Sequence, residues 1–191
     1  MTSLKSFLPV LSDLLHETPD ALYGRQRALM GLEVMDSKPG RGPGSGARLT
    51  AKNVAALIIS LLAASTLGDV DEQIISLCGA HILEDDKRQH RKLSLHTMTF
   101  LEAATIAVGG IDTHKMSWLT APETIRVTMP WRGQIVGGLR GSDTLSFDYE
   151  PRFTAPPDPI RVTREIDELY FKKIKEDVRV AVKIAEYDED E

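Results

Sequence analysis

Four side chains that could contact nucleic acid lie close together near the N-terminus: Tyr23, Arg25, Gln26 and Arg27. Arginine and glutamine can each form two parallel hydrogen bonds to a base edge, arginine with guanine and glutamine with adenine. At 100° per residue in a helix, Tyr23 and Arg27 lie on the same face and Arg25 points away from it. Arg27 is therefore the favoured base contact, and Arg25 is either a phosphate contact or a plain surface charge.

The basic character continues beyond these residues. Residues 25–52 hold six Lys or Arg against two acids, although the whole chain has a net charge of −5. A locally basic segment on an acidic chain is typical of a surface that binds phosphates, although a solvated loop has the same composition. The further candidates for contact with DNA in this segment are Lys38, Arg41, Arg48 and Lys52.

Two helices joined by a short turn are needed to position the first group. Apolar residues recur at helical spacing over residues 4–16. Thr18-Pro19 is a typical helix start, because threonine caps free amides and proline fits the first helical position. Two helices with so short a connection form a helix-turn-helix, whose second helix can enter the major groove of DNA. An ordinary helical hairpin has the same spacing, so both interpretations stay open.

A stretch rich in proline and glycine, residues 39–46, ends the second helix because both residue types disfavour helix. It is not a nucleotide-binding loop, since no strand precedes it and no Gly-Lys-Ser/Thr ends it. A flexible linker and a wing remain. In the wing, Arg41 and Arg48 reach DNA phosphates or a minor groove. Thr50 then caps a third helix with one buried apolar face.

The order of these features resembles MerR-type winged helix-turn-helix proteins and their excisionase-like relatives. The resemblance covers roughly residues 4–63, about a third of the chain. It implies that the helix at residues 23–27 faces DNA and that the wing adds further contacts. This loop is longer and richer in glycine than in that family, and no long coiled coil follows. The promoter-untwisting mechanism of MerR regulators is therefore not expected. The residues that carry the resemblance are Tyr-x-Arg-x-Arg at 23–27, Gly31-Leu32, Pro39-Gly40-Arg41 and Arg48-Leu49-Thr50.

The rest of the chain changes from helices to strands. Helices are predicted over residues 69–82, where Asp69 and Glu72 form a capping-box pattern, and over residues 95–108. Alternating residues predict strands at 124–129, 133–136 and 144–149. Thr163 is predicted to cap a last helix with the apolar stripe Ile166, Leu169, Tyr170, Ile174, Val178 and Val182.

The predicted fold class is therefore mostly α, with an N-terminal winged helix-turn-helix and a small α+β C-terminal unit. We expect residues 1–65 to form the DNA-binding domain and residues 66–94 a helical connector. Residues 95–186 are expected to form a domain for dimerisation or partner binding, and residues 187–191 a disordered acidic tail.

No pattern for enzyme chemistry, a metal site or a cofactor emerges. The spacing of Cys78, His81, His90 and His96 matches no structural zinc motif, and Cys78 falls on an apolar face. We therefore expect no enzyme activity, no metal and no cofactor. Four aromatic residues could stack bases on a small sheet, although core packing is their more typical role: Trp118, Trp131, Phe147 and Tyr149.

Three functions fit this sequence. The favoured one is a sequence-specific DNA-binding transcriptional regulator, because it accounts for the basic loop and the order of helices together. The glycine-rich loop also resembles proteins of bacterial prophages and phage-like elements. The alternatives are an architectural DNA-binding factor of the excisionase or terminase kind, and a phage-encoded adaptor or inhibitor that does not bind DNA.

The expected partners follow from the favoured function. They are double-stranded DNA, a second copy of the chain in a homodimer, and the transcription machinery or a second regulatory protein. One cysteine and the lack of a signal sequence or a long apolar run predict a cytoplasmic protein without membrane contact.

Overall fold

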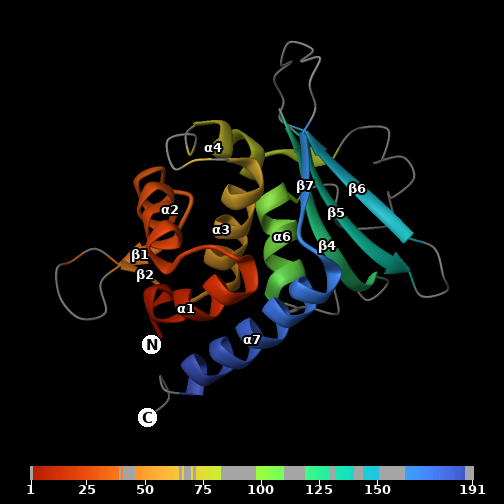
Figure 1. Cartoon of the computed structure of the whole chain (residues 1–191). Coiled ribbons are helices and arrows are strands. Elements are labelled where there is room, and N and C mark those ends of the chain that lie inside the picture. The colour runs from red at the N-terminus through yellow and green to blue at the C-terminus, as the bar shows by residue number, and fades with distance from the viewer. Residues whose placement is uncertain are drawn as a thin grey trace.

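Helices occupy one side of the molecule and an antiparallel sheet the other, as the computed structural model shows (Figure 1). The described part of the chain is mostly helical, which confirms that part of the predicted fold class. None of the described helices is long and apolar enough to cross a membrane. The structure describes residues 2–38, 40, 46–64, 66, 70, 72–82, 98–109, 119–129, 132–139, 144–150 and 162–187.

Three helices form the N-terminal side: α1 (Leu4–Leu15), α2 (Pro19–Gly31) and α3 (Ala51–Ala63). The predicted caps of the second and third helices are confirmed. The side-chain oxygens of Thr18 and Thr50 each accept a hydrogen bond from the backbone amide three residues further on. The connection between α1 and α2 is three residues long, as the helix-turn-helix prediction requires.

A two-stranded hairpin separates α2 from α3. Strand β1 (Ser37–Lys38) pairs antiparallel with β2 (Gly46–Ala47), and Gly46 has a φ of +99°, which favours glycine. The backbone of Arg48 forms a further antiparallel bridge with Ser3, just before α1. Two short strands therefore pair on either side of the glycine-rich stretch, and the start of the chain lies beside them, while the winged helix-turn-helix stays a prediction.

Helix α3 lies at the centre of the molecule (Figure 1). Ten of its 13 residues are buried, whereas the sequence predicted a single buried face. The difference arises because α2 packs on one side of α3, and α6 (Phe100–Gly109) and the sheet pack on others. A helix covered on several sides needs apolar residues around most of its circumference.

The helix in the segment after α3 is shorter than predicted. Helix α4 spans Glu72–Cys78, and Ile82 belongs to the short strand β3 (His81–Ile82) and pairs with Tyr149. Helix α6 begins at Phe100 because the preceding Thr99 and Glu102 form a reciprocal capping box that the sequence analysis missed. The predicted cap Asp69 and the charged run at residues 84–92 lie outside the described residues.

The sheet has five antiparallel strands in the order β3-β6-β5-β4-β7. Its three central strands confirm the three predicted strands and extend beyond them. The edge strands β3 and β7 were not predicted. The four strands of this sheet other than β3 are β4 (Leu119–Met129), β5 (Arg132–Leu139), β6 (Thr144–Glu150) and β7 (Val162–Glu165).

The predicted start of the last helix is wrong. Thr163 lies in β7, where it pairs with Thr128 across the ladder, and α7 spans Glu168–Tyr187. Of the predicted apolar stripe, Ile174 and Val178 are buried as expected, whereas Leu169 is 73% exposed and Tyr170 is also exposed. Phe171, which was not predicted, completes the buried face against α6, α1 and β4.

The described buried apolar residues, from Leu4 to Val178, form one connected core. Phe100 of α6 stands over Gly133 of β5, where a Cβ atom would lie 2.6 Å from its ring. This close approach joins the helical side to the sheet. The division of the chain at residues 65 and 94 stays a prediction, and the acidic tail lies almost wholly outside the described residues.

Candidate nucleic-acid interface

Arg25 does not face solvent in the structure. Its side chain is only 5% exposed, and the guanidinium donates hydrogen bonds of 3.0 Å to the backbone oxygens of Ser60 and Ala64. These carbonyls belong to the C-terminal end of α3, which carries a partial negative charge and lacks partners within its own helix. Arg25 therefore caps α3 from α2, and the expectation that it contacts DNA is corrected.

Gln26 is also buried, with 3% of its surface exposed. Its Nε2 atom lies 3.9 Å from the sulfur of Met30, and its Oε1 atom is buried without a hydrogen-bond partner in the described structure. A side chain in this position cannot reach the edge of an adenine. The expectation that Gln26 reads a base is therefore corrected as well.

The outward face of α2 carries Tyr23 and Arg27. Arg27 is exposed, and Tyr23, one turn earlier, is half-buried. The ammonium group of Lys5 in α1 lies 4.6 Å from the centre of the Tyr23 ring, which is a cation–π contact. The structure thus brings Lys5, Tyr23 and Arg27 to one side of the paired helices.

Lys5 was missed by sequence reasoning. It is the single Lys or Arg among the first 24 residues, which was the available signal. The sequence does not indicate that Lys5 meets Tyr23, because they are 18 positions apart and lie on different helices.

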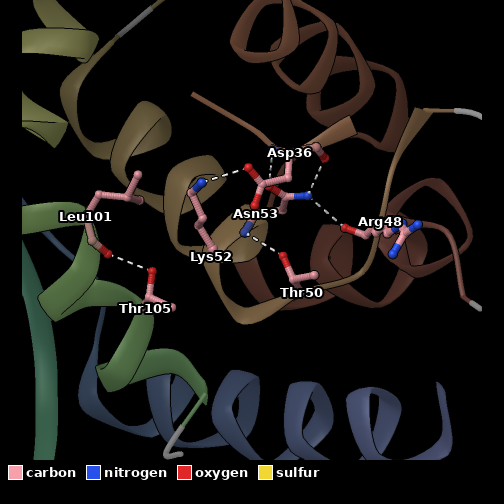
Figure 2. Close-up of polar contacts among 7 residues, drawn as sticks. All are labelled: Asp36, Arg48, Thr50, Lys52, Asn53, Leu101 and Thr105. Carbon is pink, nitrogen blue, oxygen red and sulfur yellow. Dashed lines mark hydrogen bonds and ion pairs between the residues drawn. The ribbon is translucent and has the colours of Figure 1, made fainter. Parts of the chain in front are cut away.

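The base of the hairpin is held by Asn53, in the first turn of α3 (Figure 2). Its Nδ2 donates hydrogen bonds to the backbone oxygens of Asp36, at 3.0 Å, and Arg48, at 2.9 Å. Its Oδ1 accepts a hydrogen bond from the backbone amide of Asp36 at 3.0 Å. Asn53 is fully buried. One side chain therefore joins both strands of the hairpin to α3.

Asn53 is a second residue that sequence reasoning missed. A polar residue directly before the apolar positions of a helix with one predicted buried face was the available signal. Its partners could not be predicted, because Asp36 and Asn53 are 17 positions apart and the whole glycine-rich loop lies between them.

We name the three hydrogen bonds of the Asn53 side chain the clamp. Lys52 lies beside this clamp and forms an ion pair with Asp36 (Figure 2). The Nζ–Oδ1 distance is 2.7 Å, and the two side chains are 41% and 63% exposed. Such an exposed pair contributes little to stability. The carboxylate of Asp36 also offsets the positive charge that Lys52 could offer to a phosphate.

The other basic residues of the hairpin are placed differently. Lys38 is exposed on β1, and Arg48 follows β2 directly. Figure 2 shows the side chain of Arg48 extending away from Asn53, while its backbone oxygen points toward it. The bridge between Arg48 and Ser3 places the hairpin base next to the first turn of α1, which carries Lys5. Arg41 lies outside the described residues.

We name the outward group formed by Lys5, Tyr23, Arg27, Lys38 and Arg48 the basic surface. Its members lie on α1, α2 and the hairpin, although they are spread over 44 positions of the sequence. Arg27 lies one turn from Tyr23, Tyr23 contacts Lys5, and the segment before Lys5 pairs with Arg48. In Figure 1, α1, α2 and the hairpin lie on the side away from the five-stranded sheet.

Other candidate chemistry finds little support in the described residues. Burial raises the pKa of the Cys78 thiol to about 12, so this thiol stays protonated at neutral pH and is a poor nucleophile. No group of three or more His, Cys, Asp or Glu gathers to hold a metal in the described part of the chain. His90, His96 and the two tryptophans lie outside it.

The predicted aromatic platform is not formed by Tyr149. Its side chain is 1% exposed and packs against Phe100, with ring centres 5.3 Å apart. Burial, together with the nearby carboxylate of Glu102, raises the pKa of Tyr149 far above its usual range. This residue therefore serves the core and is not available to stack on a base.

Comparison of the chain with protein-family models, with curated proteins and with solved structures finds no significant match.

Proposed function

We propose that this protein binds double-stranded DNA through the basic surface and acts as a sequence-specific transcriptional regulator. In this proposal α1 and α2 form a helix-turn-helix, α2 enters the major groove, and the hairpin acts as a wing. The order of α1, a three-residue turn, α2, a two-stranded hairpin and α3 supports this assignment. So does the position of the hairpin beside the paired helices and not beside the sheet (Figure 1).

The observation that carries the proposal is the path from Arg27, one helical turn from Tyr23, through the contact of Tyr23 with Lys5, to Ser3, whose backbone bridges Arg48. Phosphate contacts supply most of the affinity of DNA-binding proteins, and they need cations that are spaced along one surface. The path provides such spacing from two helices and a hairpin. Arg27 and Arg48, at its two ends, have no ion-pair partner in the described structure.

Specificity rests mainly on Arg27 in this proposal. Its guanidinium is exposed on the outward face of α2 and can form two hydrogen bonds with a guanine in the major groove. Gly31, one turn later, is exposed, and a Cβ atom there would meet nothing within 4 Å. The backbone at this end of α2 is therefore open to a close approach by DNA.

The test is selection of binding sites from random duplexes by the purified protein, followed by titration of the enriched site. Arg27→Ala is expected to weaken binding to that site by about 1–3 kcal/mol, the value of one good base contact. Lys173→Ala is the matched control, because Lys173 is an exposed cation on α7, paired with Asp177.

Each result has a distinct meaning. An enriched motif, with Arg27→Ala weakened and the control unchanged, supports the regulator. Two half-sites about 10 base pairs apart add a dimer to the proposal. Salt-sensitive binding without a motif replaces the regulator by an architectural DNA-binding protein. If the wild-type protein binds no duplex at low salt, the proposal is wrong.

A further inference from the structure

Strand β1 begins and strand β2 ends beside the same buried side chain, that of Asn53. Asp36 directly precedes β1, Arg48 directly follows β2, and Asn53 bonds to the backbone of both. We infer that Asn53 is a positioning residue that fixes the direction of the hairpin before DNA arrives, so that the contacts of Arg48 with phosphate depend on Asn53. This inference rests on the proposed function.

The side-chain amide of Asn53 acts as a neighbouring strand would. It accepts from the backbone amide of Asp36 and donates to the backbone oxygen of the same residue, which is the exchange of two bonds found in an antiparallel ladder. Its second N–H then reaches the carbonyl of Arg48 on the other strand. An asparagine can provide these three bonds, whereas a serine or an aspartate cannot.

Because the Asn53 side chain is buried, the loss of any of these hydrogen bonds is costly. Asn53 is 0% exposed, and its own backbone amide is held by the hydroxyl of Thr50 at 3.1 Å. Water cannot easily replace a bond lost in such a place, so other orientations of the hairpin leave buried polar groups without partners. The clamp therefore favours one orientation.

The orientation of Arg48 depends directly on this clamp. Its backbone oxygen is turned inward to Asn53, and its backbone also pairs with Ser3. With these two restraints the side chain extends away from Asn53, as Figure 2 shows. Releasing the inward bond removes one of the two restraints that direct the guanidinium.

The same helix also fixes α2. Arg25 of α2 is bonded to the last turn of α3, while Asn53 lies in its first turn. A helix of 13 residues is about 20 Å long, and α3 is buried over most of that length. The two elements of the proposed interface are thus held at opposite ends of one rigid helix, which lowers the entropy lost on binding.

The first measurement uses the wild-type protein and needs no variant. Hydrogen exchange of the Asp36 amide is measured in the free protein and in complex with the selected duplex. We expect strong protection in the free protein, comparable to that of the amides in the middle of α3, and less than a threefold change when DNA binds. Rapid exchange in the free protein, slowed only by DNA, overturns the inference.

The second measurement is a double-mutant cycle with Asn53→Ala and Arg48→Ala, titrated on the selected duplex over a range of salt concentrations. Arg48→Ala is expected to lower the salt slope by about one unit. Asn53→Ala is expected to lower it by a similar amount, and the double variant by no more than either single variant. A merely structural role would lower the melting temperature and leave the slope of the folded protein unchanged.

Thr105→Ala is the matched control. The hydroxyl of Thr105 donates to the backbone oxygen of Leu101 at 2.7 Å in α6, so this variant removes one partly buried hydrogen bond away from the hairpin (Figure 2). Its DNA affinity is expected to stay within twofold of wild type.

The outcomes separate the inference from the proposed function. Wild-type protein that binds no duplex overturns both. Wild-type protein that binds, together with folded Asn53→Ala of unchanged slope, or additive effects in the cycle, overturns the inference alone.

Discussion

The helical side and the sheet side of the molecule bury different kinds of side chain. The buried polar or charged residues of the described chain all lie on the helical side, in α2 and α3: Arg25, Gln26, Asn53 and Ser60. On the sheet side, the described buried side chains are apolar, apart from the hydroxyl of Tyr149. Hydrogen bonds from buried side chains join α2 and the hairpin to α3, whereas the side-chain bonds between strands of the sheet are exposed or partly buried.

This difference indicates where the molecule needs a fixed geometry. Apolar contacts are not directional, so they hold helices together without fixing one orientation. A buried hydrogen bond fixes an orientation, because other orientations leave its donor or acceptor unpaired. The bonds of Arg25 and Asn53 serve that purpose for α2 and for the hairpin, the two elements of the proposed interface.

The largest effect is expected from Phe100→Ala in α6, where the helical side meets the sheet. Phe100 is fully buried, lies over Gly133 and packs against Tyr149. Its loss is expected to lower the free energy of unfolding by about 3–5 kcal/mol, measured by chemical denaturation. Leu169→Ala, at an exposed position of α7, is the control and should change stability by less than about 0.5 kcal/mol.

The comparison also predicts what Phe100→Ala leaves unchanged. The folded fraction of this variant should bind DNA like wild type, since the polar bonds of the helical side remain. A loss of affinity in the folded protein would contradict the separation of the two sides.

The next effect is expected from Arg25→Met. Methionine fills much of the same space, but the carbonyls of Ser60 and Ala64 lose their donor at the end of α3. We expect a loss of about 2–3 kcal/mol in the free energy of unfolding, since bonds from a charged group are stronger than neutral ones. Arg27→Met, on the exposed face of the same helix, should have almost no effect on stability. Equal stability of the two variants would contradict the capping role of Arg25.

These two arginines show how far sequence reasoning reaches. The helical period correctly separates Arg25 from Arg27, and it favours Arg27 as the outward residue. It does not indicate that the other face is buried, because an arginine is rarely buried unless it has partners. Those partners are backbone carbonyls 35 and 39 residues away. Every residue has a backbone carbonyl, so the residue types do not indicate which one Arg25 bonds to.

The strands of the sheet also differ in how far the sequence predicts them. Its three central strands were predicted from alternation and turn residues within single segments. The edge strands β3 and β7 are two and four residues long, too short for a periodic pattern. They form because a neighbouring strand offers free backbone groups, as Met129 and Thr128 do for Val162 and Thr163. Such pairing depends on the assembled fold.

A smaller effect of opposite sign is expected from Gly31→Ala. Gly31 is the last residue of α2, its backbone φ is not positive, and an added Cβ meets nothing within 4 Å. Alanine is the better helix former, so the free energy of unfolding should rise by about 0.5–1 kcal/mol. Thermal unfolding measures the change. A decrease in stability would indicate that this end of α2 is more closely packed than the structure shows.

The smallest effect is expected from Lys52→Ala, at the base of the hairpin. Its ion pair with Asp36 is exposed, so its loss should cost less than about 1 kcal/mol and should shrink as salt is added. Asn53→Ala, one residue further on, removes three part-buried bonds made by a fully buried side chain and should cost about 2 kcal/mol or more. A larger loss from Lys52→Ala than from Asn53→Ala would reverse the assignment of the clamp.

The salt dependence of DNA binding tests the basic surface most directly. The affinity of wild type, Arg27→Ala, Lys38→Ala, Arg48→Ala and the control Lys173→Ala is titrated on one duplex at several salt concentrations. The proposal predicts a steep slope for wild type, an unchanged slope for the control and a loss of about 0.9 units for each phosphate contact removed by Lys38→Ala or Arg48→Ala. Slopes equal to that of wild type in both hairpin variants, or no binding by wild type at low salt, would contradict it.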